Sequence, residues 1–205
     1  MARRSKQDAQ LTRDAILDAA ARVFRDKGVA RTRMEDIAQG ANFTRGAVYW
    51  HFKNKTDVLL ALSERVSLPL YDQINQIIAA RPADPLDAWR RHLLDSIGKI
   101  ERDGEQQNTC DILLNRCELN GELEPLHELE QQRSAFFIES TQRLFEQARD
   151  AGLLRPDADL AMAALAMHGM INGLIRLWLS QAGGFPLRDT VEASADMLLS
   201  AARVR

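Results

Sequence analysis

Residues 43–55 read FTRGAVYWHFKNK and combine hydroxyl, ring and cationic side chains. Hydroxyl and cationic groups donate hydrogen bonds to phosphate oxygens, and an arginine side chain can pair with the O6 and N7 acceptors of guanine. Interior helices rarely place Tyr, Trp and His side by side and then end in Lys-Asn-Lys. The stretch therefore has the chemistry of a surface that contacts nucleic acid, although Tyr49 and Trp50 could instead be packing residues.

A helix that begins after Thr44 would divide these side chains between two faces. Val48 and Phe52 lie one turn apart and are expected to anchor the helix on an apolar core. On the other face, Arg45 is expected to read a base edge. Gly46 would let the helix approach the groove closely, because it has no side chain. The two faces together predict a recognition helix for a DNA major groove.

Other polar groups nearby are expected to bind phosphate. Tyr49 offers a hydroxyl donor, and His51 and Lys55 lie where the chain would leave the groove. Thr32 offers a hydroxyl beside the free backbone N–H groups at the start of the preceding helix, which is a common phosphate site. The predicted DNA-binding set is Thr32, Arg33, Thr44, Arg45, Gly46, Tyr49, Trp50, His51 and Lys55.

The charge of the chain is unevenly distributed. The whole sequence has a net charge of −2. Residues 1–60 contain 12 Lys and Arg against 7 Asp and Glu, a net of +5, whereas residues 61–205 contain 15 against 22, a net of −7. A basic segment followed by an acidic one indicates that the first part meets a polyanion. The basic tail of Arg3, Arg4 and Lys6 could reach a minor groove, or it could be idle.

The elements that must position these residues are helical. Apolar residues recur at helical spacing along nearly the whole chain, and no long alternating run predicts a strand. The expected fold is all-α, with about nine helices in two domains. A three-helix DNA-binding domain with a helix-turn-helix would occupy residues 1–55, with its reading unit at about 33–52. A larger helical ligand-binding and dimerisation domain would occupy residues 56–205.

Helix boundaries follow from capping and breaking residues. A first helix is expected from about Thr12 to Gly28, and the second opens with a Thr32-x-x-Glu35 capping box. Residues 101–108, ERDGEQQN, are expected to form a polar loop. Further helices are expected from about 56 into the 70s, from about 86 to 100, from 109 to 119, up to Gly152, from about 160 to 183 and from about 188 to 203.

Residues 160–179, LAMAALAMHGMINGLIRLWL, are apolar nearly all round. Such a helix either spans a membrane or is buried on two sides, and the Gly169-x-x-x-Gly173 spacing fits close helix packing. Against a membrane span, the run contains three polar side chains, His168, Asn172 and Arg176. We therefore expect no membrane contact, with one buried side against an internal cavity and the other against a second subunit.

The segment from about Thr12 to Lys55 resembles the DNA-binding domain of the TetR family of bacterial regulators, and the block TRGAVYWHFKNK carries the likeness most specifically. RCEL at 116–119 and GLIRLWL at 173–179 are similar to the AcrR/TtgR-like subgroup, which represses drug-efflux pump genes. The resemblance implies a cytoplasmic homodimeric repressor whose last two helices pair with their copies. It also implies a palindromic double-stranded DNA operator and release by a hydrophobic small-molecule effector.

The effector is expected to be contacted by apolar residues with a few polar groups. Position-by-position similarity to the subgroup implies the contacts Val66, Trp89, His92, Leu93, Ser96, Ile97, Cys110, Leu113, Leu114, Phe137, Thr141, His168, Ile171 and Asn172. Most of these side chains could equally be core, and the polar ones could equally make structural hydrogen bonds. Asn172 is not an acid, so pairing with a cationic drug is less supported there. Glu118 is the nearest other acid, but it could instead pair with Arg116 or Arg176.

Other functions have weaker support. The sequence shows no nucleophile elbow, P-loop, dinucleotide-binding or metal-binding signature, so we assign no enzymatic activity, no cofactor and no metal site. On one helix, Cys110 and Cys117 would be separated by a rise of about 10.5 Å, too far for a disulfide, and reduced thiols are expected. The alternatives that remain are a TetR-like regulator of a metabolic or signalling pathway and, more remotely, a small-molecule enzyme or a helical interaction module without DNA binding.

Overall fold

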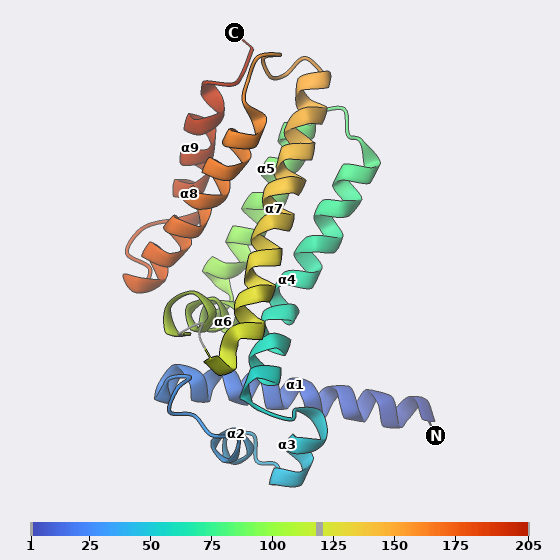
Figure 1. Ribbon diagram of the computed structural model, residues 1–205, viewed down its shortest axis with the longest axis vertical. Coiled ribbons are helices and arrows are strands. Elements are labelled where there is room, and N and C mark those ends of the chain that lie inside the picture. The colour runs from blue at the N-terminus through green and yellow to red at the C-terminus, as the bar shows by residue number, and fades with distance from the viewer. Residues whose placement is uncertain (1, 118–120, 205) are drawn as a thin grey trace. The chain divides into compact units, whose positions relative to one another are not determined.

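The computed structural model describes residues 2–117 and 121–204. These residues form the helices α1 (Ala2–Lys27), α2 (Met34–Gly40), α3 (Arg45–His51), α4 (Lys55–Ala80), α5 (Pro85–Arg102), α6 (Gly104–Asp111), α7 (Glu124–Asp150), α8 (Leu160–Ser180) and α9 (Leu187–Ser200). A π-helical turn at Ile112–Arg116 follows α6, and a short 3-10 turn at Gly121–Leu123 precedes α7. The predicted all-α fold with about nine helices is confirmed (Figure 1).

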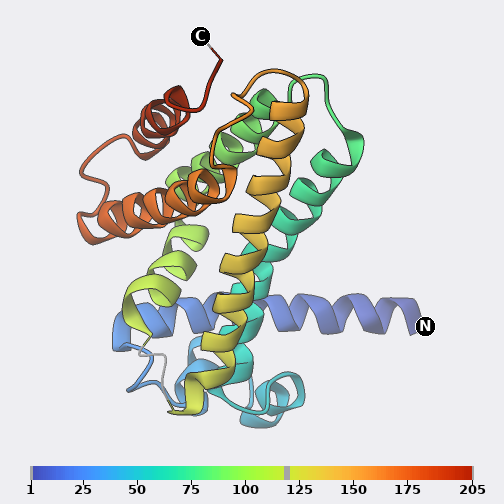
Figure 2. The ribbon, with the colours of Figure 1, turned by 45° about the horizontal axis from the view of Figure 1, so that its top comes forward.

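The chain folds into two compact units. The first consists of Met1–Val66 and Gly104–His127, and the second of Ser67–Asp103 and Glu128–Arg205. Both α4 and α7 therefore contribute residues to both units. Within the second unit, the later part of α4 and α5 run antiparallel, because only residues 81–84 connect them (Figure 2).

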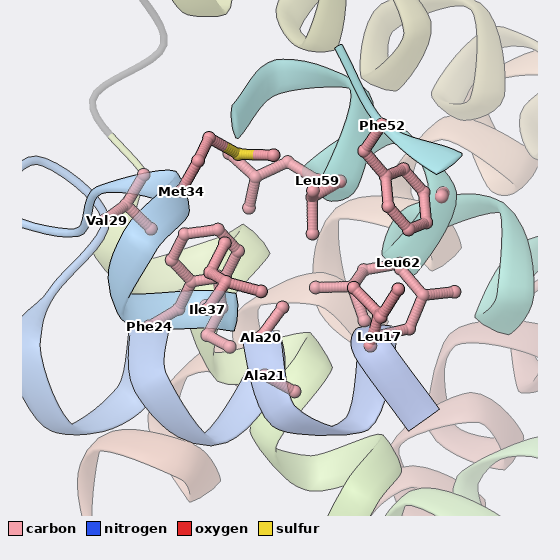
Figure 3. Packing of buried hydrophobic residues seen from close by; sticks show 14 of the residues in the cluster. Leu17, Ala20, Ala21, Phe24, Val29, Met34, Ile37, Phe52, Leu59 and Leu62 are labelled. Carbon is pink, nitrogen blue, oxygen red and sulfur yellow. The ribbon is translucent and has the colours of Figure 1, made fainter. Parts of the chain in front are cut away.

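The core of the first unit is built on α1. Leu17, Ala20 and Phe24 recur at helical spacing on one face of this helix, and all three are fully buried. They belong to the same apolar cluster as Ile37 of α2 and Leu59 of α4 (Figure 3). Burial of each large apolar side chain stabilises the fold by about 1.5–3 kcal/mol. This cluster holds the short helices in place, because helices of two turns are not stable alone.

The core of the second unit centres on α5 and α7. The Trp89 ring lies edge-on to Phe145, with 5.3 Å between ring centroids, and its indole N–H lies 3.4 Å from the Thr141 hydroxyl oxygen. Leu144 and Leu160 are buried in the same cluster. The last helix, α9, packs against both α5 and α8. These contacts fix the position of α8 and leave part of its apolar surface exposed, including Met162, Leu165 and Leu177.

The start of the first helix differs from the prediction. The helix begins at Ala2 rather than near Thr12. Residues 2–11 contain no Gly or Pro and are rich in Ala, Arg, Lys, Gln and Leu, all of which have high helix propensity. The segment predicted as a tail is therefore the first part of α1.

The predicted capping box at the start of the second helix is wrong by one residue. The N-cap of α2 is Arg33, whose backbone N–H donates to the Asp36 carboxylate at 3.0 Å. The Thr32 hydroxyl instead donates to the Gly28 carbonyl at 2.8 Å. Since this bond uses the Thr32 side chain in the preceding turn, the helix starts one position later. Glu35 is left to form a 2.6 Å ion pair with Arg45.

The polar loop predicted at 101–108 is also wrong. The helix α5 continues to Arg102, and α6 begins at Gly104, so only Asp103 separates the two helices. The sequence of α6, GEQQNTCD, buries only Thr109 and Cys110. Because so few of its residues are apolar, the helix has no apolar periodicity from which it could be detected.

Candidate DNA interface and effector site

A tight turn joins α2 to α3. Asn42 adopts a positive φ of 57°, a conformation that Asn tolerates better than most residues. The Phe43 backbone N–H donates to the Ala38 carbonyl at 3.0 Å, which closes the turn. A Cβ atom added to Gly40 would lie 2.9 Å from Cγ2 of Val23, so the glycine lets α2 approach α1 closely. This geometry is that of a helix-turn-helix.

The third helix is anchored on one face, as predicted. Thr44 is its N-cap, and the Thr44 hydroxyl accepts from the Ala47 backbone N–H at 3.2 Å. Val48 is fully buried, and Phe52 is 2% exposed. The Arg13 guanidinium lies over the Phe52 ring, 5.1 Å from its centroid. The packing roles predicted for Val48 and Phe52 are therefore confirmed.

The opposite face of α3 is open to solvent. Gly46 has only one heavy atom within 4 Å of the place where a Cβ would lie, the Thr44 hydroxyl oxygen at 4.0 Å. Trp50 is 74% exposed, so the packing interpretation is wrong for this residue, and Tyr49 is 43% exposed. The Arg45 guanidinium lies 6.0 Å from the centroid of the Tyr49 ring and pairs with Glu35. The face thus presents a cation, a phenol and an indole beside an uncovered stretch of backbone.

Of the remaining residues predicted to contact DNA, Thr32 and Lys55 already form hydrogen bonds within the protein. Thr32 is 4% exposed and its hydroxyl already donates to the Gly28 carbonyl. The Lys55 ammonium donates to the Val29 carbonyl at 2.8 Å, although an ammonium group has two further donors. Burial, with a smaller effect from the charge of Arg13, lowers the pKa of His51, which favours a neutral ring at pH 7. Arg33 is exposed at the start of α2.

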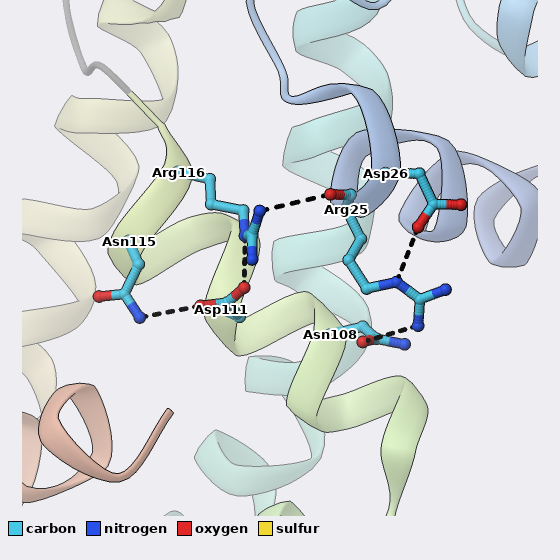
Figure 4. A network of polar contacts seen from close by, with 6 residues as sticks. All are labelled: Arg25, Asp26, Asn108, Asp111, Asn115 and Arg116. Carbon is cyan, nitrogen blue, oxygen red and sulfur yellow. Dashed lines mark hydrogen bonds and ion pairs between the residues drawn. The ribbon is translucent and has the colours of Figure 1, made fainter. Parts of the chain in front are cut away.

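A polar network ties α6 and the π-helical turn to the end of α1 within the first unit (Figure 4). The Arg25 guanidinium donates to the Asn108 side chain at 3.3 Å, and the Arg116 guanidinium donates to the Arg25 carbonyl at 3.3 Å. Arg116 also forms an ion pair with Asp111. This network could not be predicted from the sequence, because it links side chains far apart in the chain. Glu118, the predicted partner of Arg116 or Arg176, lies outside the described residues.

The residues predicted to contact an effector fall in both units. Val66, Cys110, Leu113 and Leu114 belong to the first unit, and the others belong to the second. In the second unit, Trp89 lies beside Thr141, as described above. The Asn172 amide donates to Nε2 of His168 at 2.9 Å, and burial lowers the pKa of His168. Ile97 is 2% exposed and Trp89 3%, as ordinary core residues would be.

The second unit also contains a groove of about 570 Å³ between α4 and α5. His92 is the one predicted effector residue that lines it. Burial lowers the pKa of His92, and the neighbouring Lys99 lowers it further. The other lining residues were not predicted to form a site, although Arg91, Lys99 and Arg102 follow each other at helical spacing along one helix.

Comparison with known proteins gives two family matches. Residues 16–62 match the family described as bacterial regulatory proteins, tetR family. Residues 84–203 match the family described as the MAATS-type transcriptional repressor, C-terminal region.

Individual relatives resemble nearly the whole chain. The HTH-type transcriptional regulator TtgR of Pseudomonas putida is 34% identical over 208 residues, which cover 100% of this chain and 97% of TtgR. The HTH-type transcriptional regulator AcrR of Shigella flexneri is 31% identical and covers 97% of this chain and 93% of AcrR. The structure of SmeT, the repressor of the Stenotrophomonas maltophilia multidrug efflux pump SmeDEF, superimposes with a TM-score of 0.82 at 33% identity, covering 96% of this chain and 93% of SmeT. A SmeT–triclosan complex gives a TM-score of 0.86 at 34% identity, covering 95% and 92%.

Proposed function

Because this chain belongs to the TetR family of bacterial regulatory proteins, we propose that it is a cytoplasmic repressor of a multidrug efflux operon. A hydrophobic small molecule bound in the domain of residues 56–205 releases it from a palindromic operator. The observation that carries the DNA-binding part of the proposal is the division of α3 into a buried face and an open face. The efflux target rests on relatives such as SmeT, which is itself described as an efflux-pump repressor.

In the DNA complex, α3 enters the major groove with its open face. Arg45 pairs with a guanine edge, and Gly46 allows the start of the helix to come close to the bases. Tyr49 and Trp50, together with the basic groups of Arg33 and Lys55, lie against the flanking sugar–phosphate backbone. The exposed ion pair between Arg45 and Glu35 opposes this only weakly, because exposed pairs contribute about 0–1 kcal/mol.

A homodimer through α8 and α9 would place two copies of α3 on the two halves of a palindrome, about 34–36 Å apart. Several large apolar side chains on these two helices are exposed in the single chain: Met162, Leu165, Leu177, Met197 and Leu198. Cβ atoms added to Gly169 or Gly173 would meet nothing within 4 Å, so another helix could approach closely there.

The same helix α8 is long and apolar enough to cross a membrane by length and composition, yet only 22% of its most apolar window is buried within the chain. A second copy of the chain explains this unburied surface without a membrane. The polar groups of His168 and Asn172, which bond to each other, also suit a protein partner or a cavity better than lipid.

The test is binding to the DNA upstream of the protein's own coding sequence, measured by fluorescence anisotropy at low salt. We expect the protein to bind a palindromic fragment. At least one member of a panel of antibiotics, flavonoids, dyes and triclosan should release the protein from this DNA. Failure to retain any palindromic DNA would overturn the proposal. If the protein binds the palindromic DNA but no compound releases it, the protein is a repressor that responds to a different signal.

A further inference from the structure

The groove between α4 and α5 has a size and shape that suit an extended small molecule. Its volume of about 570 Å³ lies within the usual range for small-molecule sites. Lining residues on α5 run from Ala88 to Arg102, which corresponds to about 21 Å of helical rise. All of its lining residues belong to the second unit. An elongated ligand would therefore fit it better than a compact one.

The two ends of the groove differ in chemistry. Because α4 and α5 run antiparallel, Ile77, Ala80 and Ala88 lie toward the short connection between the helices (Figure 2). Lys99 and Arg102 lie toward the other end, about 16–21 Å along α5 from Ala88 by helical rise. The end near the connection thus carries the apolar side chains, beside Arg91 and its partner Asp87, and the other end carries Lys99 and Arg102.

The acidic side chains in and beside the groove neutralise its cations only in part. The lining contains three cations, Arg91, Lys99 and Arg102, and one acid, Asp95. Arg91 pairs with Asp87 at 2.8 Å, outside the lining, so the three cations and the two acids together leave a formal charge of +1. Across residues 2–117 and 121–204, neither Lys99 nor Arg102 forms an ion pair.

The Arg102 side chain folds back along α5 and lies over Gly98. A Cβ atom added to Gly98 would lie 2.9 Å from Nη1 and 3.1 Å from Nη2 of Arg102, so the guanidinium occupies the space that a side chain would otherwise fill. Gly98 itself is buried. The positions of Lys99 and Arg102 in the last turn of α5 also complement the helix dipole. That role alone would affect the stability of the helix and not the binding of any ligand.

We infer that this groove binds an elongated organic anion, with its carboxylate or phosphate head at Lys99 and Arg102 and its apolar chain directed along the groove toward Ile77, Ala80 and Ala88. The two cations at one end supply charge-assisted hydrogen bonds to the head group. The apolar end removes the chain from water. The inference goes beyond repression and does not require the chain to bind DNA.

The test is isothermal titration of the full chain with octanoate, and with octan-1-ol as the uncharged analogue. The variant Lys99→Met/Arg102→Met removes the two cations and keeps their apolar stems. The matched control, Arg143→Met/Arg149→Met, removes the same charge from α7, outside the groove. We expect octanoate to bind more tightly than octan-1-ol, and the groove variant to weaken octanoate by about tenfold, whereas the control changes it by less than about twofold.

Four results would overturn the inference. Equal affinities for octanoate and octan-1-ol, or no octanoate binding at all, would show that the groove does not select an anion. Equal weakening of octanoate binding in the two double variants would indicate only a long-range electrostatic effect of the removed charge. Unchanged binding in the groove variant would place octanoate elsewhere. The swap Lys99→Arg/Arg102→Lys should retain binding, and thermal unfolding of each variant separates loss of the site from loss of the fold. Since no DNA is present, the result is independent of the proposed repressor function.

Discussion

Arg45 is the residue on which base recognition is expected to depend. Its side chain is 66% exposed, forms an exposed ion pair with Glu35 and lies over the Tyr49 ring. We predict that Arg45→Ala weakens binding to the specific operator by about 1–3 kcal/mol, because the bidentate contact with guanine is lost. Fluorescence anisotropy at fixed salt, with the operator and with a scrambled duplex, measures the change.

The control for this prediction is Arg45→Lys, which keeps the charge but lacks the planar fork. We expect it to restore binding to the scrambled duplex without restoring preference for the operator. If the alanine variant binds the operator as tightly as the original chain, Arg45 does not read a base.

His168 gives the stability of the protein a dependence on pH. Burial lowers its pKa below the ordinary value of 6.5, and the same direction holds for His92 and His51. The folded state thus binds fewer protons than the unfolded state near pH 6. The stabilisation is complete above pH 6.5 and is lost as the pH falls through the lowered folded-state values.

We therefore predict that the thermal midpoint declines between pH 7 and pH 5, and that His168→Gln makes this decline shallower. Calorimetry at several pH values tests the prediction. An identical pH dependence in the variant would mean that His168 titrates in the folded protein as it does in the unfolded chain.

At the scale of the helices, two glycines of the helix-turn-helix have opposite surroundings. A Cβ at Gly40 would lie 2.9 Å from the stiff, β-branched side chain of Val23. We predict that Gly40→Ala lowers the free energy of unfolding by about 1–3 kcal/mol, because α2 must move away from α1. Chemical denaturation measures this loss.

Gly46→Ala is the counterpart, since the nearest neighbour of its Cβ would be 4.0 Å away. It should leave the stability unchanged or raise it by up to about 1 kcal/mol, because alanine favours a helix. We expect it to weaken operator binding nonetheless, because the methyl group stands between α3 and the bases. Full operator affinity in this variant would show that close approach at Gly46 is not needed.

Some of the helices and helix boundaries could be predicted from the sequence, and others could not. The recognition helix was identifiable because Thr44, Val48 and Phe52 satisfy local rules of capping and spacing. The helix α6 was not, since its residues are mostly polar and helical periodicity depends on apolar side chains. Thr32 misled the prediction of the second N-cap, because its hydroxyl bonds to Gly28 in the preceding turn, a contact set by the backbone path.

Among the site residues too, some could be predicted from the sequence and others could not. The predicted face of α3 depends on one helix alone, and the exposure of Trp50 excludes a packing role for that residue. The groove between α4 and α5 needs two helices to come together, and the polar network of Arg25 and Arg116 needs three segments. Contacts of that kind depend on tertiary packing, which periodicity does not reveal.

At the scale of the whole molecule, the exposed apolar surface of α8 and α9 favours a dimer. Leu165 on α8 and Leu68 on α4 are both 52% exposed, so they offer a matched pair of substitutions. We predict that Leu165→Glu shifts the protein to monomers, because a charge buried without a partner costs about 3–5 kcal/mol. Mass photometry and sedimentation measure the shift.

Operator binding by the Leu165→Glu variant should weaken as well, because a monomer holds only one half of a palindrome and loses the gain from simultaneous binding. Leu68→Glu should remain dimeric with full operator affinity, since Leu68 lies outside the proposed interface. A Leu165→Glu variant that stays dimeric would exclude this face of α8. If both variants become monomeric, the subunits instead associate through a surface that includes α4, and the spacing of the two recognition helices must be set there.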